Sequence, residues 1–198
     1  ANDLVVSIAL MDEIETLNID DVKKRENVFL RSSIIVLDIN LAQDTLEYIA
    51  KTYQAKEIYV NAMSCQKADR IKSIYPYIHT LKMSIVEARY LAEIKDEIDD
   101  EELGRYFLSK GVKNVFITKG KSASFSLTAH GYKKMSNKQV TVKNICGAED
   151  AYLAGIIYAR IHNLDPLLYA TKAALITLGD QKAVCEEISI ENISEKTI

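Results

Sequence analysis

The sequence predicts an α/β fold built around a mainly parallel central sheet. Short apolar runs rich in β-branched residues alternate along the chain with segments of helical periodicity, a pattern typical of βαβ units. The chain has 198 residues, of which 48% are hydrophobic, and this is enough to bury a sizeable core. No internal repeat, low-complexity stretch or linker rich in Pro and Gly interrupts the pattern, so one αβ core is the simplest expectation.

The first half of the chain is expected to hold three strands with helices between them. In order, these elements are a strand at 34–39, a helix at 42–53, a strand at 58–60, a helix after Ser64 and a strand led by residues 78–81. Both helices have apolar residues at helical spacing, and Ser64 is placed to cap the second. Ser84 and Glu87 form a Ser-x-x-Glu pattern, which is typical of a capping box at the start of a further helix.

The second half continues the alternation and adds a hairpin. In order, we expect a helix at 99–109, a strand at 115–118, an antiparallel hairpin of 122–128 and 132–136, a strand-like run at 139–143, and helices at 150–162 and 166–178. Gly111 is placed to end the first of these helices, and Pro166 suits the first turn of the last one. The acidic run 97–102 is expected to be a solvated helix start.

Composition excludes several classes of function. A net charge of −3 and a pI near 5.7 give no basic surface, so a nucleic acid polymer is not an expected partner. No apolar run approaches the ~20 residues that cross a bilayer, and the N-terminus lacks the pattern of a secretory signal. The three cysteines are widely spaced and the three histidines are scattered. This argues against a zinc site or a disulfide framework and fits a cytoplasmic location.

Residues 144–155, Asn-Ile-Cys-Gly-Ala-Glu-Asp-Ala-Tyr-Leu-Ala-Gly, carry the strongest functional signal. They follow the strand-like run, pass through a tight turn at Gly147 and Ala148, and open an apolar helix. The first N–H groups of a helix have no partner within it, and with the helix dipole they favour a phosphate or an oxyanion. Asp150 stands where a carboxylate could take a proton from a substrate hydroxyl. The alternative is that this acid is an N-cap before an ordinary core helix.

The same residues resemble the C-terminal signature of the PfkB/ribokinase family of sugar and nucleoside kinases, Asp/Asn-Thr-x-Gly-Ala-Gly-Asp-x-Phe-x-x-Gly. The positions in agreement are Asn144, Gly147, Ala148, Asp150 and Gly155, and Tyr152 stands for the aromatic residue. The sequence departs at Ile145, where the family has Thr, and at Glu149, where it has Gly. Residues 60–68, 78–88 and 111–120 resemble stretches of the pseudouridine-kinase-like branch of the family. The resemblance runs in order from about Asn2 to Asn192.

This resemblance implies a ribokinase-like fold with three αβα layers and a mainly parallel sheet, whose lid and N-terminal strands are largely missing. Residues 1–13 would be the remnant of a lid strand, and residues 14–198 the nucleotide-binding core. An incomplete sheet edge invites pairing with another chain. We therefore expect a homo-oligomer or a complementing N-terminal chain as partner, besides nucleotide and sugar or nucleoside ligands.

The resemblance also implies an activity, the transfer of the ATP γ-phosphate to a hydroxyl of a sugar or nucleoside such as pseudouridine. Asp150 would be the catalytic base. The residues implied in binding are Gly147, Ala148 and Glu149 for the anion hole, Thr118, Gly120, Ala174 and Thr177 for the nucleotide, and Glu87 for Mg²⁺. For Glu87 the capping box remains an equal alternative, and for residues 173–178 a plain core helix does.

A second interpretation is a truncated, catalytically degenerate homologue that binds only nucleotide or a partner chain. It is favoured by the lack of a counterpart to the N-terminal third of family members. It is also favoured by altered residues at five site positions: Asn61, Ser84, Ala123, Ile145 and Glu149. Glu149 weighs most, because glycine permits positive φ and close approach of the backbone, whereas glutamate adds a Cβ and a negative charge. Two unit charges about 5 Å apart at an effective dielectric constant of 20 repel by about 3 kcal/mol.

Overall fold

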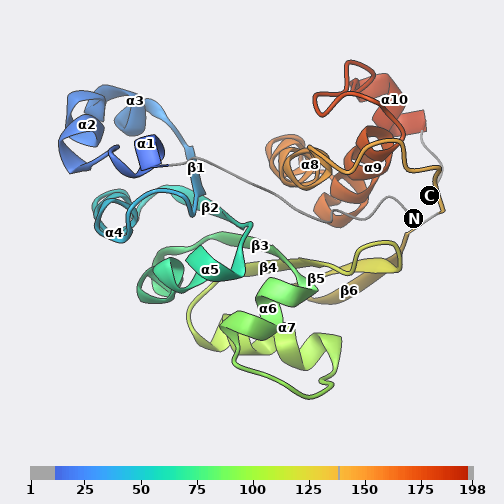
Figure 1. The fold of residues 1–198 in the computed structure, drawn as a ribbon, viewed down its shortest axis with the longest axis horizontal. Helices are drawn as coiled ribbons and strands as arrows, with labels where there is room; N and C mark the ends of the chain where they lie inside the picture. Colours follow the sequence, from blue (N-terminus) through green and yellow to red (C-terminus); the bar gives the residue numbers. More distant parts are fainter. Residues whose placement is uncertain (1–11, 138, 196–198) are drawn as a thin grey trace. The chain divides into compact units, whose positions relative to one another are not determined.

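A computed structural model describes residues 12–137 and 139–195 of the chain (Figure 1). These residues fall into two compact units. The sheet unit contains residues 12–118 and 126–132, and the C-terminal unit contains residues 119–125, 133–137 and 139–195. In order along the chain, the elements are α1 (Asp12–Glu15), α2 (Ile19–Lys24), α3 (Glu26–Arg31), β1 (Ile34–Asp38), α4 (Gln43–Thr52), β2 (Glu57–Ala62), α5 (Cys65–Ala68), the 3₁₀ helix η1 (Asp69–Tyr77), β3 (Thr80–Ser84), α6 (Ile85–Leu91), α7 (Asp100–Ser109), β4 (Asn114–Thr118), β5 (Ala123–Thr128), β6 (Gly131–Ser136), α8 (Ala148–His162), α9 (Pro166–Leu178) and α10 (Ile190–Glu195).

The strands follow one another in the sheet in chain order, from β1 to β6. Strands β1 to β4 pair in parallel, and their register aligns Leu37, Val60, Leu81 and Val115 in one row across the sheet. All four side chains are buried, as is usual for parallel strands that bear helices on their faces. The prediction of an α/β fold with a mainly parallel sheet is confirmed.

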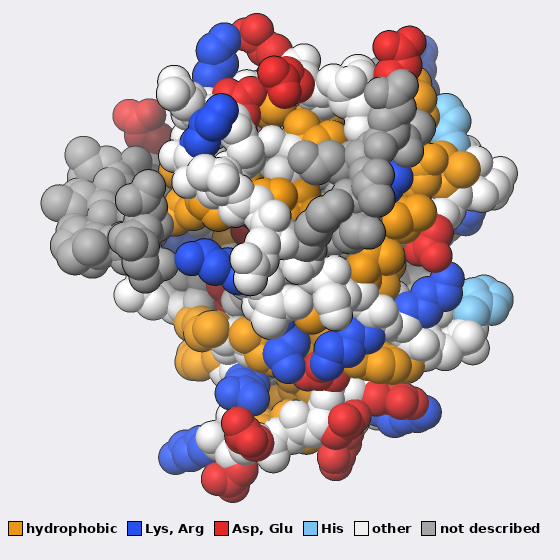
Figure 2. Space-filling view, turned by 90° about the vertical axis from the view of Figure 1, so that its right-hand side faces the viewer, with side chains coloured by type: hydrophobic (Ala, Val, Ile, Leu, Met, Phe, Trp, Pro, Cys, Tyr) orange, Lys and Arg blue, Asp and Glu red, His pale blue; other side chains and the backbone are white. Residues whose placement is uncertain are grey.

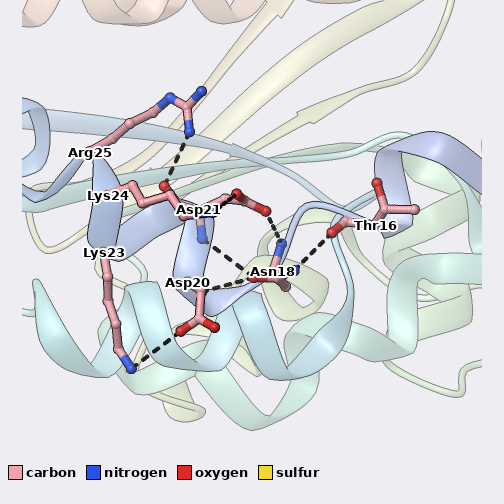
Figure 3. A network of polar contacts seen from close by, with 7 residues as sticks. All are labelled: Thr16, Asn18, Asp20, Asp21, Lys23, Lys24 and Arg25. Carbon is pink, nitrogen blue, oxygen red and sulfur yellow. Dashed lines mark hydrogen bonds and ion pairs between the residues drawn. The ribbon is translucent and has the colours of Figure 1, made fainter.

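The helices of the sheet unit form where local signals place them. α4 buries Leu46 and Ile49 on one face and packs against η1, and α6 and α7 contact β3 and β4. The predicted capping box at the start of α6 is present. An equivalent box starts α2, where the Asn18 side chain accepts from the N–H groups of Asp20 and Asp21, and the Asn18 N–H donates to Asp21 (Figure 3). No helix is predicted from the sequence in the region of α1 to α3.

Several sequence predictions need correction. Residues 139–143 form no strand. Instead, the Lys143 N–H donates to the Leu178 carbonyl (2.9 Å), which joins this segment to the C-terminal end of α9. The helix after Ser64 is short and continues as the 3₁₀ helix η1, which contains Pro76, a residue without an N–H to donate. Ser64 occupies the N-cap position but makes no capping bond through its side chain. In the acidic run, Asp100 is buried rather than solvated.

In the C-terminal unit, α8 and α9 pack closely. A Cβ on Gly155 would lie 2.6 Å from the Ala170 Cα, so only glycine permits this approach of the two helices. Beneath α8, the Ser124 and Thr171 hydroxyls are 2.9 Å apart. Tyr152 of α8 is buried as well, and this burial raises the pKa of its phenol. The start of α8 is therefore held on a well-packed support.

On the face shown in Figure 2, acidic and basic side chains are interspersed, with hydrophobic side chains between them. Among the helices in the described part of the chain, none is both long and apolar enough to span a membrane. The predicted boundary between residues 13 and 14 falls inside α1. Most of the proposed lid-strand remnant, 1–13, lies outside the described residues.

Candidate functional site

The turn before α8 is shaped by Gly147, the N-cap residue of that helix. Gly147 has φ 81° and ψ −11°, a left-handed conformation, which costs a residue with a Cβ roughly 1–2 kcal/mol. A Cβ at this position would also overlap the carbonyl oxygen of Ala183. Glycine is therefore required here by backbone conformation and by space. Because glycine has no side chain, the N-cap residue of α8 makes no side-chain capping bond.

The residues that follow place two carboxylates in the first turn of α8. Ala148 is buried, whereas Glu149 and Asp150 are exposed. Asp150 is the third residue of the helix, so the alternative in which it is the N-cap is wrong. Asp150 thus stands beside the positive end of the helix dipole, where a negative charge is stabilised. The helix starts two residues earlier than predicted, at Ala148, because Gly147 provides the bend.

The predicted nucleotide residues of α9 lie in its last two turns. Thr177 is buried, and its hydroxyl donates to the Ala173 carbonyl (3.1 Å). Ala174 is half-buried. The Thr177 hydroxyl therefore bonds within its own helix, and in this arrangement the residue contributes shape rather than a hydrogen bond to a ligand.

Glu87 and Thr118 lie at the carboxyl edge of the parallel strands. The Ser84 N–H donates to Glu87 Oε2 (2.7 Å), and the Glu87 N–H donates to Ser84 Oγ (3.4 Å), which forms the capping box of α6. Ser84 is in register with Thr118, so the ends of β3 and β4 are neighbours. Gly120 follows β4 in the C-terminal unit with φ 55° and open space around it.

A further polar group at this edge was not anticipated from the sequence. Asp38 ends β1 and accepts from the Asn40 N–H (2.6 Å), while Lys67 donates to the Asn40 side chain (3.1 Å). Arg70 donates to the carbonyl oxygens of residues 39–41 (3.4, 3.1 and 3.0 Å). Ligands of open α/β sheets bind at the carboxyl ends of the strands. The available signal was the Asp-x-Asn sequence that begins at the last residue of β1.

The predicted site residues thus form two groups. Glu87 and Thr118 belong to the sheet unit; Gly120, residues 147–150, Ala174 and Thr177 belong to the C-terminal unit. Within the described residues, no cluster of three or more His, Cys, Asp or Glu could hold a metal ion. Mg²⁺ keeps several waters and needs one or two carboxylates plus phosphate oxygens. A single acid such as Glu87, whose capping bond uses one carboxylate oxygen, is compatible with that chemistry.

The pfkB family carbohydrate kinase model matches residues 5–184 of the chain. Pseudouridine kinase of Escherichia coli (strain K12) is 21% identical over 197 residues, a match that covers 96% of this chain and 63% of the relative. The chain therefore spans less than two thirds of the length of that relative.

Solved structures share the fold. A protein from Clostridium perfringens, provisionally described as a sugar kinase, superposes with a TM-score of 0.85 at 25% identity, covering 97% of this chain and 62% of the other. A provisionally assigned Ribokinase II from E. coli, solved in complex with ATP and Mg²⁺, gives a TM-score of 0.72 at 16% identity over 85% of this chain and 59% of its own. The α/β fold is ribokinase-like, and the chain belongs to the pfkB family of carbohydrate kinases.

Proposed function

We propose that this chain is a kinase that transfers the γ-phosphate of ATP to a hydroxyl of a sugar or nucleoside, with a pseudouridine-like acceptor. The observation that carries the proposal is an exposed carboxylate, Asp150, in the first turn of a helix whose N-cap is a left-handed glycine. In phosphoryl transfer the protein mainly positions groups and stabilises charge. One base beside an anion-binding helix start is sufficient for that chemistry.

In this mechanism Asp150 accepts the proton of the attacking hydroxyl. The main-chain amides of residues 147–149 face the transferring phosphoryl group and stabilise the charge on its oxygens. Thr118 and Gly120 contact the nucleotide phosphates at the sheet edge, and Ala174 and Thr177 help to wall the base. Glu87 would hold Mg²⁺, largely through water, and the metal would neutralise phosphate charge.

A second candidate is a homologue that binds nucleotide without transferring phosphate, alone or with a partner chain. One observation favours it: Glu149 puts a second negative charge in the first turn of α8. A homo-oligomer or a complementing N-terminal chain would supply further binding surface. Both candidates predict nucleotide binding, and only the first predicts phosphoryl transfer.

Thermal unfolding with and without Mg-ATP tests both candidates. A ligand at about 100 times its Kd stabilises the folded state by about 2.7 kcal/mol, and each kcal/mol shifts the Tm of a chain this size by about 2–4 °C. We therefore expect Tm to rise by roughly 5–10 °C at saturation. A Tm that stays constant up to millimolar Mg-ATP contradicts both candidates. ADP release in the presence of pseudouridine or ribose then separates the first candidate from the second.

Replacing Glu149 with glutamine should strengthen Mg-ATP binding. Glu149 is exposed, so its repulsion of a phosphate charge about 5 Å away lies nearer the water value of about 0.8 kcal/mol than the 3 kcal/mol of a partly shielded site. We expect a Kd about 3–10 times lower by titration calorimetry. Glu191→Gln, in the first turn of α10, removes an exposed acid from the same unit and should leave Kd unchanged. Equal or weaker binding by Glu149→Gln would show that this acid does not repel the nucleotide.

A further inference from the structure

The segment before α8 is tied at three points to the last residue of α9 and to the segment that follows it. The Lys143 N–H donates to the Leu178 carbonyl (2.9 Å), and the Asn144 side-chain amide donates to the Gln181 carbonyl (2.9 Å). At the third point, Gly147 packs so tightly against the Ala183 carbonyl that no Cβ could fit between them. We name residues 179–185 the buttress loop, because Gln181 and Ala183 within it contact the glycine turn.

The Asn144 side chain makes two hydrogen bonds, one as acceptor and one as donor. Its Oδ1 accepts from the Cys146 N–H (2.9 Å), which closes the turn locally, and its Nδ2 donates to the Gln181 carbonyl (2.9 Å), which ties the turn to the buttress loop. An amide side chain can do both, because its oxygen accepts and its nitrogen donates. An aspartate would keep the first bond and lose the second, and an alanine would lose both.

The buttress loop is itself fixed to both helices. The Asp180 N–H donates to the Thr177 carbonyl (3.0 Å), and the Asp180 carboxylate accepts from the Lys182 N–H (2.9 Å). This backbone bond, together with a hydrogen bond from the Cys185 thiol, lowers the pKa of Asp180. The Cys185 side chain is buried in a cluster that includes Ala151 of α8 and Ile176 of α9. The loop therefore has a fixed position relative to the helix that it supports.

We infer that Asn144 is a positioning residue, which sets the orientation of the Gly147 turn and thereby the direction of the first amides of α8. The inference rests on the proposed function for the identity of the ligand, a transferring phosphoryl group. Gly147 has no side chain with which to hold its own turn, so any side-chain support comes from its neighbours. The bond to the Gln181 carbonyl and the contact with Ala183 provide that constraint.

The test measures the affinities of Mg-ATP and Mg-ADP by titration calorimetry for the wild type, Asn144→Asp and Asn144→Ala. ADP lacks the phosphoryl group that the turn would hold. A hydrogen bond of this kind is worth about 0.5–1.5 kcal/mol, so we expect the preference for ATP over ADP to fall about 3–10-fold in both variants. The affinity for ADP should stay within about twofold. A merely structural role would weaken both nucleotides equally, and that result would overturn the inference.

Asn192 provides a matched control, because its side-chain amide also donates to a backbone carbonyl, that of Glu187 (2.7 Å), in the same unit. Asn192→Ala should leave the preference for ATP unchanged. If the wild type binds neither nucleotide, the proposed function fails, and amide hydrogen exchange decides the inference separately. Faster exchange at residues 147–149 in Asn144→Ala, and not in Asn192→Ala, supports the tether. Unchanged exchange at these amides contradicts it.

Discussion

Replacing Asp150 with asparagine should lower kcat for phosphoryl transfer by about 10²–10⁴-fold, the usual contribution of a positioned general base. Asparagine has nearly the same shape and cannot accept the proton of the attacking hydroxyl. The affinity for Mg-ATP should stay the same or rise slightly, because the substitution removes a negative charge near the phosphates. The measurement is ADP release with saturating Mg-ATP and pseudouridine, together with the Kd for Mg-ATP by calorimetry.

The position of Asp150 in its helix suggests the control. Glu102 is the third residue of α7, as Asp150 is of α8, and both acids are exposed. Glu102→Gln removes a carboxylate from the same helical position in the sheet unit and should leave kcat unchanged. A turnover by Asp150→Asn equal to that of the wild type would mean that another group takes the proton, and the proposed mechanism would be wrong.

Local signals predicted the fold well. The apolar runs that become β1, β2 and β4 were identified within one or two residues. A buried parallel strand is a nearly continuous run of apolar residues, so its signal is local. The Ser84 and Glu87 capping box was predicted for the same reason, since both of its hydrogen bonds join residues three apart. The same kind of pattern, Asn18-x-x-Asp21, was present at α2 and shows that this missed helix left a detectable signal (Figure 3).

Contacts between residues distant in sequence were not predictable in this way. Residues 139–143 have the composition of a strand, yet the Lys143 N–H bonds to the end of α9, and nothing near Lys143 in the sequence indicates that partner. A tight turn at Gly147 and Ala148 was predicted from the motif. The need for glycine at position 147 was not, because one of its causes, the Ala183 carbonyl, lies on a loop more than 30 residues away.

The same distinction applies to the candidate site. Motif spacing placed Asp150 in the first turn of a helix, and the structure adds that Gly147, rather than an acid, is the N-cap. The spacing of residues in the sequence did not decide whether Glu87 caps a helix or binds a metal ion. The structure shows the capping bonds, and the carboxylate that makes them remains at the carboxyl edge of the strands. Capping fixes the side chain, and a fixed carboxylate is suited to hold a hydrated ion.

Gly147 is the residue on which both the packing and the proposed chemistry depend, and Gly147→Ala should have the largest effect on stability. Left-handed backbone costs alanine about 1–2 kcal/mol, and displacing the Ala183 main chain costs about 1–3 kcal/mol more. We expect Tm to fall by roughly 5–15 °C and Mg-ATP binding to be lost at temperatures where the variant is folded.

Gly120→Ala separates the two causes of this destabilisation, because Gly120 also has a positive φ (55°) but no atom within 4 Å of the position that a Cβ would occupy. It should lower Tm by only about 2–6 °C, since it bears the conformational cost alone. The excess loss in Gly147→Ala then measures the contact with the buttress loop. Equal losses in the two variants would mean that the loop yields readily to a methyl group. In that case the turn before α8 would lack the rigid support that a preorganised phosphoryl site requires.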